Sequence, residues 1–520
     1  MNASRLNARC GSPKIWLPIV LISSLCATCV QPGFAIALRG PRVHAQLAGA
    51  LTTTSAPSSK SGQTQFIVRD SIGLPGLNLT CLLLGCNVLE SIGDPTGQLF
   101  VVQNVGSLDP VTFLTQLLSA AGIVDAELDQ NVSTLGATIG TIPPYLTDKT
   151  PIWYYGAQVW EGYVIQTPNQ IVNTTQTHST FRVSGRGVTV AMIDTGIDPN
   201  NSILAPHLVN GYDFTRNTSG GSEMGDINQS TAGVIDGSTQ TAQVNQSTAG
   251  VIDGSTQTAQ VNQSTAGVID GSAQTAQVNQ STAGVIDQGS AQVINQAKYS
   301  AFGHGTMTAG IVHLVAPRAQ LMPLKAFNAN GTGYASDVLR AIYYAVNHNA
   351  KVISMSFEFA SPSLELANAI NYATISNVIC VASAGNDGAM TIVYPSGLPN
   401  VIDVASTSNT NTPSSFSNYG TPPVWISAPG EAVMSTYPFN TYAVGWGTSF
   451  STPFVSGTVA LMANWNSGLL NQTSAAYALS HAQPIPESQY GFGVLDTYQA
   501  VQAWKSTSNP DLFDFNLDLF

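Results

Sequence analysis

The chain has 520 residues, of which 43% are hydrophobic and only 9% are charged, and it contains 47 glycines. This composition is typical of globular domains and argues against a fibre or a disordered chain. A net charge of -12 also argues against nucleic acid or an anionic membrane surface as a partner.

The first 37 residues have the organisation of an export signal. Basic residues precede a mostly apolar stretch at 15–30, and residues 35–37 have the small-x-small form of a cleavage site. The apolar stretch is short for a membrane span and contains Pro18, and no later stretch is long enough either. We therefore expect a signal peptide at 1–37, a secreted protein and no transmembrane helix; an uncleaved membrane anchor is the alternative.

A linker is expected at 38–65, followed by a compact unit at 66–130. Within that unit, strand and helix patterns follow one another in the order βαββαβ, which is the order of a ferredoxin-like fold. Cys81 and Cys86 lie close together in the unit. They either pair in an oxidising compartment or remain two apolar core thiols, and the sequence leaves both interpretations open.

From residue 187 the pattern changes to apolar strands that alternate with amphipathic helices. In residues 336–349, apolar side chains recur at helical spacing behind Ser336, a residue able to cap the first turn. Such alternation predicts an α/β fold, with a parallel sheet covered by helices on both faces. Ligands bind at the carboxyl ends of the strands in sheets of this kind.

A tandem repeat at 228–296 interrupts this alternation. The 17-residue sequence at 228–244 recurs identically at 245–261 and with one Thr→Ala change at 262–278, and a shortened copy begins at Asn279. A flexible polar loop is the favoured interpretation of this segment. A stack of short strand-and-turn rungs is the alternative.

Three widely separated motifs carry side chains suited to nucleophilic catalysis. Asp194 ends an apolar strand in Ile-Asp-Thr-Gly, His304 opens a helix in Gly-His-Gly-Thr, and Ser449 precedes a helix in Gly-Thr-Ser. An imidazole can take the proton of a serine hydroxyl, and a buried carboxylate can hold that imidazole in one tautomer. Pro453 suits the first turn of the helix after Ser449. Asn386, in the turn Ala-Gly-Asn-Asp-Gly, is placed to donate a hydrogen bond to an oxyanion.

Together these motifs resemble those of the subtilase family of serine proteases. Each motif alone is common, but their order along the chain is that of subtilisin. The resemblance covers about 187–505 and implies a subtilisin-like α/β fold and a secreted serine endopeptidase that forms an acyl-enzyme. It implies that Asp194, His304 and Ser449 are the catalytic triad and that Asn386 serves the oxyanion hole.

The resemblance also implies a precursor organisation. The unit at 66–130 would be an inhibitory propeptide that blocks the active-site cleft, and 131–186 would hold the junction and the start of the mature enzyme. The repeats would then be an insertion between two triad residues, and 506–520 a C-terminal tail. The expected partners are protein or peptide substrates and the chain's own propeptide, and we expect a monomer.

Further segments are similar to the substrate cleft of the family. The residues expected to bind substrate are Gly331, Gly333, Tyr334, Ser356, Ser383, Ala384 and Gly385. The sequence departs from the family at Phe357 and Glu358, which replace Leu and Gly. Glu358 would either favour a basic substrate side chain or, in the favoured interpretation, be a solvated residue at a strand end.

Many members of the family bind calcium, and calcium is therefore the one cofactor that the resemblance allows. The sequence has no clear calcium loop. Its candidate oxygen ligands, which follow no recognisable pattern, are Asp198, Asp213, Glu223, Asp226 and Asp387.

Two other functions fit single features of the sequence. Aspartic proteases also use Asp-Thr-Gly, but they need two such carboxylates and this chain has one such motif. A surface-binding protein on an inactive protease scaffold would explain the repeats. The presence of all four catalytic residue types argues against that second alternative.

Overall fold

The computed structural model describes residues 64–133, 144–226, 301–420 and 424–508, together with four short strands between residues 249 and 294. The expected signal peptide, most of the linker at 38–65 and most of the tail at 506–520 lie outside this part of the chain. Among the described residues, no helix is both long and apolar enough to cross a bilayer.

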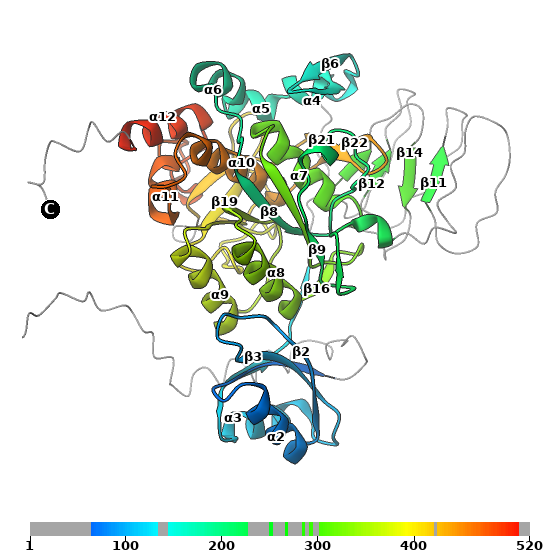
Figure 1. Ribbon diagram of the computed structural model, residues 1–520. Coiled ribbons are helices and arrows are strands. Elements are labelled where there is room, and N and C mark those ends of the chain that lie inside the picture. The colour runs from blue at the N-terminus through cyan, green and yellow to red at the C-terminus, as the bar shows by residue number, and fades with distance from the viewer. Residues whose placement is uncertain are drawn as a thin grey trace, which may run out of the picture. The chain divides into compact units, whose positions relative to one another are not determined.

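The first unit has the element order βαββαβ, around one antiparallel sheet with strand order β2-β3-β1-β4. In its core, the rings of Phe66 and Phe113 lie 5.1 Å apart. The elements, drawn in blue to cyan in Figure 1, are β1 (Gln65–Asp70), α2 (Leu74–Leu84), β2 (Cys86–Ser91), β3 (Leu99–Asn104), α3 (Pro110–Ser119) and β4 (Ile123–Leu128).

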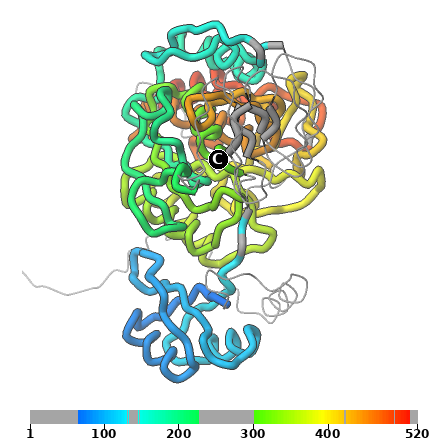
Figure 2. Tube along the Cα trace, turned by 90° about the vertical axis from the view of Figure 1, so that its right-hand side faces the viewer, coloured from blue at the N-terminus to red at the C-terminus, as the bar shows by residue number. Residues whose placement is uncertain are grey.

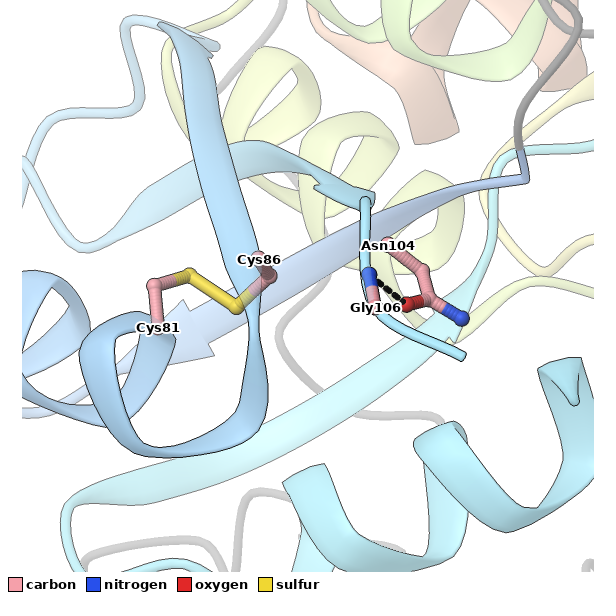
Figure 3. Close-up of a disulfide and its surroundings, with 4 residues drawn as sticks. All are labelled: Cys81, Cys86, Asn104 and Gly106. Atoms are coloured by element: carbon pink, nitrogen blue, oxygen red, sulfur yellow. Dashed lines mark hydrogen bonds between the residues drawn. A yellow bond between two sulfur atoms is a disulfide. The ribbon is translucent and has the colours of Figure 1, made fainter. Parts of the chain in front are cut away.

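Cys81 and Cys86 form a disulfide in this first unit, which decides between the two interpretations of these cysteines (Figure 3). Gly85 ends α2 with a left-handed backbone (φ 75°), so that the chain reverses at once into β2. The disulfide therefore ties the last turn of the helix to the start of the strand, with the two Cα atoms 4.5 Å apart. Cys380, in contrast, is a free and buried thiol.

The second unit is built on an eight-stranded sheet with the order β10-β9-β15-β8-β17-β18-β19-β20 (Figure 1). All adjacent strands are parallel except the short edge strand β10. The strands are β8 (Thr189–Asp194), β9 (Tyr212–Asp213), β10 (Thr218–Ser219), β15 (Gln320–Lys325), β17 (Val352–Met355), β18 (Ile379–Ser383), β19 (Ile402–Thr407) and β20 (Ile426–Pro429).

Helices cover both faces of this sheet. Successive residues of a strand point to opposite faces, so each strand contributes side chains to two apolar clusters. On β8, Val190 and Met192 join one apolar cluster with side chains of α7 (His304–Val315) and α10 (Thr448–Trp465). Ala191 and Ile193 join a second cluster with α8 (Ala335–Asn347) and α9 (Leu364–Ile375). The predicted α/β fold with a doubly covered parallel sheet is confirmed.

Smaller elements complete the second unit. Helix α6 packs on α12, where the rings of Phe181 and Tyr498 lie 5.1 Å apart (Figure 2, cyan beside red). These elements are β6 (Pro151–Tyr154), β7 (Ala157–Trp160), α4 (Glu161–Ile165), α5 (Thr167–Ile171), α6 (Thr174–Phe181), β21 (Val433–Tyr437), β22 (Thr441–Gly445), α11 (Gln472–Leu479) and α12 (Thr497–Thr507).

Acidic side chains of the first unit cap helices of the second. Helix α8 begins at Ala335, so Ser336 lies inside it and does not cap it, contrary to the expectation from sequence. Asp129 supplies the cap instead, because its carboxylate accepts from Ser336 N at 3.0 Å and from Ser336 Oγ at 2.8 Å. Glu127 does the same at α9, where it accepts from Ser363 Oγ at 2.5 Å and from Leu364 N at 3.2 Å. Both carboxylates satisfy N–H groups that a helix start leaves unpaired.

The repeat segment contains four short strands, β11 (Ala249–Ile252), β12 (Ala266–Val268), β13 (Ala283–Val285) and β14 (Ala291–Ile294). Three of them begin at the same Ala-Gly-Val of successive copies. Strands β12 and β13 pair in parallel with like residues opposite each other, and β13 pairs with β22. Most of 228–296 lies outside the described residues, but the strands that are described favour the alternative with strands over the loop. Identical copies offer the same backbone pattern to one another, which permits such in-register pairing.

Candidate active site

The three residues of the predicted triad lie at the end of one strand and at the starts of two helices. Asp194 is the last residue of β8, His304 is the first residue of α7, and Ser449 is the second residue of α10. Asp194 thus sits at the carboxyl end of a strand, the usual ligand-binding edge of a parallel sheet. All three are buried, with exposed fractions of 2%, 5% and 2% respectively.

Asp194 and His304 are in direct contact. The distance from His304 Nδ1 to Asp194 Oδ1 is 2.7 Å. The same carboxylate accepts from Thr195 N at 2.7 Å and from Thr308 Oγ1 at 3.1 Å, which fixes its orientation. Because Nδ1 faces a carboxylate, it carries the proton, and Nε2 is left as the acceptor. Nε2 is buried and has no hydrogen-bond partner among the described residues.

The serine hydroxyl is not bonded to the imidazole. Ser449 Oγ donates instead to the carbonyl oxygen of Ser356, at 3.4 Å. The ring of Phe450 lies 5.6 Å from the ring of His304, so the start of α10 is beside the imidazole. Catalytic hydrogen bonds are often long or poorly aligned in the absence of substrate and tighten only in the complex.

Helix α10 begins at Thr448, at least two residues earlier than expected, so Ser449 lies in its first turn rather than before it. Pro453 consequently falls inside the helix, which corrects its predicted place in the first turn. Proline has no N–H, so the carbonyl of Ser449 loses its helical partner. Ser356 Oγ replaces that partner by donating to Ser449 O at 3.0 Å. Sequence reasoning missed this role of Ser356; the signal was a proline four residues after the serine.

Asn386 is held at the start of the same helix. Its Oδ1 accepts from Thr448 N at 2.9 Å and from Thr448 Oγ1 at 3.1 Å. Because a backbone N–H can only donate, the oxygen must face Thr448, and the donor end of the amide is therefore Nδ2. Gly447, just before the helix, has a φ of 145°, a conformation that other residues rarely adopt.

Comparison with known proteins agrees with this geometry. The sequence profile of the Subtilase family matches residues 185–493. This chain belongs to the subtilase family. Subtilisin Savinase from Lederbergia lenta is 36% identical over 210 residues, which are 38% of this chain and 78% of Savinase. Thermitase from Thermoactinomyces vulgaris is also 36% identical over 210 residues, 38% of this chain and 75% of thermitase. An alkaline protease from Alkalihalobacillus alcalophilus is equally similar over 38% of this chain, but only 55% of its own length is covered.

The extended segment that directly follows the first unit lies along the predicted substrate-binding edge of this subtilase. Strand β16 (Thr332–Tyr334) contains Gly333 and Tyr334, and Gly331 comes just before it. It pairs antiparallel with β5 (Asn131–Ser133), with Gly333 opposite Val132. A Cβ on Gly333 would collide with the carbonyl oxygen of Ala326, which explains a glycine at this place. The edge therefore accepts the backbone of an extended peptide.

Ser383, Ala384 and Gly385, the other residues expected to bind substrate, lead from the end of β18 to Asn386. Glu358 lies against them: a Cβ on Gly385 would be 2.6 Å from Glu358 Oε2. Burial, together with the charge of Asp387, raises the pKa of Glu358 to about 7. Glu358 is therefore half-buried, rather than fully solvated as the favoured interpretation expected. Phe357 is in the core against Phe327, 5.0 Å between rings, and its bulk does not fill the cleft.

The five candidate calcium ligands are held by protein donors instead. Asp198 accepts from Asn200 N and Phe439 N, and Asp387 accepts from Asn418 Nδ2. The remaining three carboxylates, whose partners include threonine, arginine and lysine side chains, are Asp213, Glu223 and Asp226. No three metal-binding side chains gather within the part of the chain that the structure describes. Calcium binding by this chain stays an expectation from the resemblance.

Proposed function

We propose that this subtilase, a serine endopeptidase that acts on protein substrates, forms an acyl-enzyme on Ser449. The observation that carries this mechanism is the 2.7 Å contact between His304 Nδ1 and Asp194 Oδ1. It leaves Nε2 as a base beside the first turn of the helix that carries Ser449. A neutral imidazole held in that tautomer is what removal of the serine proton requires.

In the first half of the reaction, Ser449 Oγ attacks the carbonyl carbon of the scissile peptide bond. His304 Nε2 takes the hydroxyl proton and then delivers it to the leaving amine, while Asp194 stabilises the imidazolium. Asn386 Nδ2 and the backbone N–H of Ser449 donate to the oxyanion of the tetrahedral intermediate. Water then attacks the ester by the same proton relay in reverse, which releases the acid and restores the serine.

The burial of the pair supports this assignment of roles. Asp194 and His304 are almost without solvent contact, so the attraction between carboxylate and imidazolium is weakly screened. The start of α10 adds unpaired N–H groups and a favourable dipole for a developing negative charge. Each of these features acts most strongly on the charged intermediate rather than on the resting enzyme.

We infer in addition that the unit at 66–130 is an inhibitory propeptide and that the chain is secreted as a precursor. The pairing of β5 with β16 supports inhibition, because an extended segment already lies on the edge assigned to substrate. The caps that Asp129 and Glu127 provide hold that unit in place. The disulfide between Cys81 and Cys86 fits export, since such bonds persist in oxidising compartments.

The mechanism is tested by expressing the chain and its Ser449→Ala variant and incubating each with a denatured protein. The unmodified chain should mature and cleave the protein, and the variant should do neither. His304→Ala should be equally inactive, because the nucleophile then has no base. Proteolysis that persists in both variants after repurification would contradict the proposal.

A further inference from the structure

Glu223 is a buried carboxylate that this mechanism does not use. It opens the short 3₁₀ turn η3 (Glu223–Asp226), directly before the repeat segment, and its exposed fraction is 0%. Burial raises its pKa to about 8, and the charge of Asp194 adds to that effect. A carboxylate buried in this way is costly unless several donors satisfy it, so its partners indicate what it does.

Three donors converge on Glu223, and all belong to the catalytic motifs. Gly303 N, just before His304, donates to Oε2 at 2.7 Å. Thr195 Oγ1, just after Asp194, donates to the same oxygen at 3.2 Å. The hydroxyl of Thr306, two residues after His304, donates to Oε1. One side chain therefore joins the turn that carries the aspartate to the helix start that carries the histidine.

The two threonines extend this connection, since each hydroxyl also accepts a hydrogen bond. Thr195 Oγ1 accepts from Gly305 N at 2.9 Å, and Thr306 Oγ1 accepts from Asp198 N at 2.8 Å. Each hydroxyl thus links the two motifs while it donates to Glu223. Because both hydroxyls donate to oxygens of Glu223, this side chain sets the direction of both hydroxyl protons. Two hydrogen bonds between the motifs, one through Thr195 and one through Thr306, thus accompany the Asp194–His304 contact.

Lys325 holds the same turn from the other side. Its Nζ is fully buried and donates to the carbonyl oxygen of Thr195 at 2.7 Å and to Asp226 Oδ2 at 2.8 Å. Lys325 lies opposite Asp194 in the pairing of β15 with β8. The hydroxyl and the carbonyl of Thr195 are therefore fixed by a glutamate and a lysine, respectively.

We propose that Glu223 is a positioning residue that fixes the distance and orientation between Asp194 and His304. The inference rests on the proposed function of this pair. Glu223 touches neither the nucleophile nor the imidazole; it acts through Thr195, Gly303 and Thr306. A displacement of about 1 Å in such a pair can cost about 100-fold in rate. Removal of this carboxylate should therefore lower kcat more than it changes KM, because substrate binding uses other residues.

The test compares Glu223→Gln and Glu223→Asp with Asp403→Asn as a matched control. Asp403 is also a buried carboxylate with a pKa raised to about 8, but it is the second residue of β19, at the strand end away from the site. For the unmodified chain and each variant, active sites are counted by fluorophosphonate labelling of Ser449, so that kcat is expressed per competent serine. A peptide substrate then gives kcat and KM separately, and thermal unfolding gives Tm.

We expect Glu223→Gln to lower kcat per labelled serine by about 10- to 100-fold, with KM within about twofold. Glu223→Asp should recover part of this loss, because it keeps the acceptor oxygens. Asp403→Asn should change Tm and leave kcat unaltered.

An unchanged kcat in Glu223→Gln, or parallel changes of kcat and KM, would overturn the inference. If that variant gives no labelled protein, an unchanged kcat in Glu223→Asp overturns it, and a lowered kcat at constant KM supports it. Failure of the unmodified chain to label would overturn the proposed function itself and this inference with it.

Discussion

Ser356 and Ser449 exchange two hydrogen bonds between neighbouring elements of the site. Ser356 Oγ donates to the carbonyl oxygen of Ser449 at 3.0 Å, and Ser449 Oγ donates to the carbonyl oxygen of Ser356 at 3.4 Å. The first bond is needed because Pro453 offers no N–H to that carbonyl. The cleft residue Ser356 is thereby a support for the helix that presents the nucleophile.

The first prediction concerns this support. Ser356→Ala leaves a buried carbonyl without a donor, and we expect a loss of about 1–3 kcal/mol in the free energy of unfolding. Pro453→Ala on the same background supplies a backbone N–H and should recover part of that loss. Denaturant unfolding of the two single variants and the double variant measures the effect. Equal losses in the presence and absence of Pro453 would show that the two residues do not act on the same carbonyl.

The second prediction concerns Asn386. Asn386→Asp keeps the acceptor for Thr448 N and Thr448 Oγ1 but replaces the N–H₂ donor with an oxygen. We expect kcat to fall by about 100- to 1,000-fold, while KM and Tm stay close to those of the unmodified enzyme. Steady-state kinetics on a short peptide check this. A similar fall in Tm would mean that the residue is mainly structural.

The third prediction is that rising pH releases the first unit. Burial raises the pKa of Glu127 to about 8, with smaller contributions from Asp125 and Glu365. A carboxyl whose pKa is raised in the folded contact stabilises it fully below the ordinary pKa and loses that effect as the pH passes about 8. The first unit should therefore leave faster at pH 9 than at pH 6.

The appearance of labelled Ser449 in the full chain at pH 6 to 9 measures this release. The labelling rate of the matured enzyme at each pH is the baseline. Glu127→Gln should remove most of the pH dependence near pH 8. Asp125→Asn is the matched control, because the pKa of Asp125 is raised only to about 6. An unaltered profile in Glu127→Gln would refute this role of the carboxylate.

The fourth prediction concerns substrate selection by Glu358. With a pKa of about 7, this side chain is neutral in mild acid and negative above neutrality. It lies against Gly385, next to Asn386, so its charge should favour basic substrate side chains as the pH rises through 7. The ratio of kcat/KM for matched lysine and leucine peptides at pH 6 and pH 8 tests this. Glu358→Gln should make the ratio independent of pH, and a persistent change in that variant would exclude Glu358 as its cause.

The sequence was sufficient to predict the sheet, because a covered parallel sheet depends on local patterns. Apolar strands alternating with helices imply a covered parallel sheet, and the position of Asp194 at a strand end follows from the pattern alone. The α/β fold is confirmed, and the chain belongs to the expected family. The contact between Asp194 and His304 follows from topology, since strand ends and helix starts meet at one edge.

Contacts between distant segments could not be predicted in the same way. Ser336 has the sequence context of a cap, yet the cap of α8 is Asp129, because a carboxylate more than 200 positions away accepts from the backbone N–H and the hydroxyl of Ser336 itself. Glu358 has the sequence context of a surface residue, yet it is half-buried and lies against Gly385, a neighbour that the sequence alone does not reveal. The strands at 249–294 arise from pairing between copies, which no single copy reveals.

The most direct test of the central claim is to identify the residue that a fluorophosphonate modifies. The matured enzyme is labelled, digested and mapped by tandem mass spectrometry, with His304→Ala and a heat-denatured sample as controls. We predict one adduct, on Ser449, that is absent from both controls. An adduct on a different residue, or proteolytic activity in a fully active preparation without any adduct, would contradict the account.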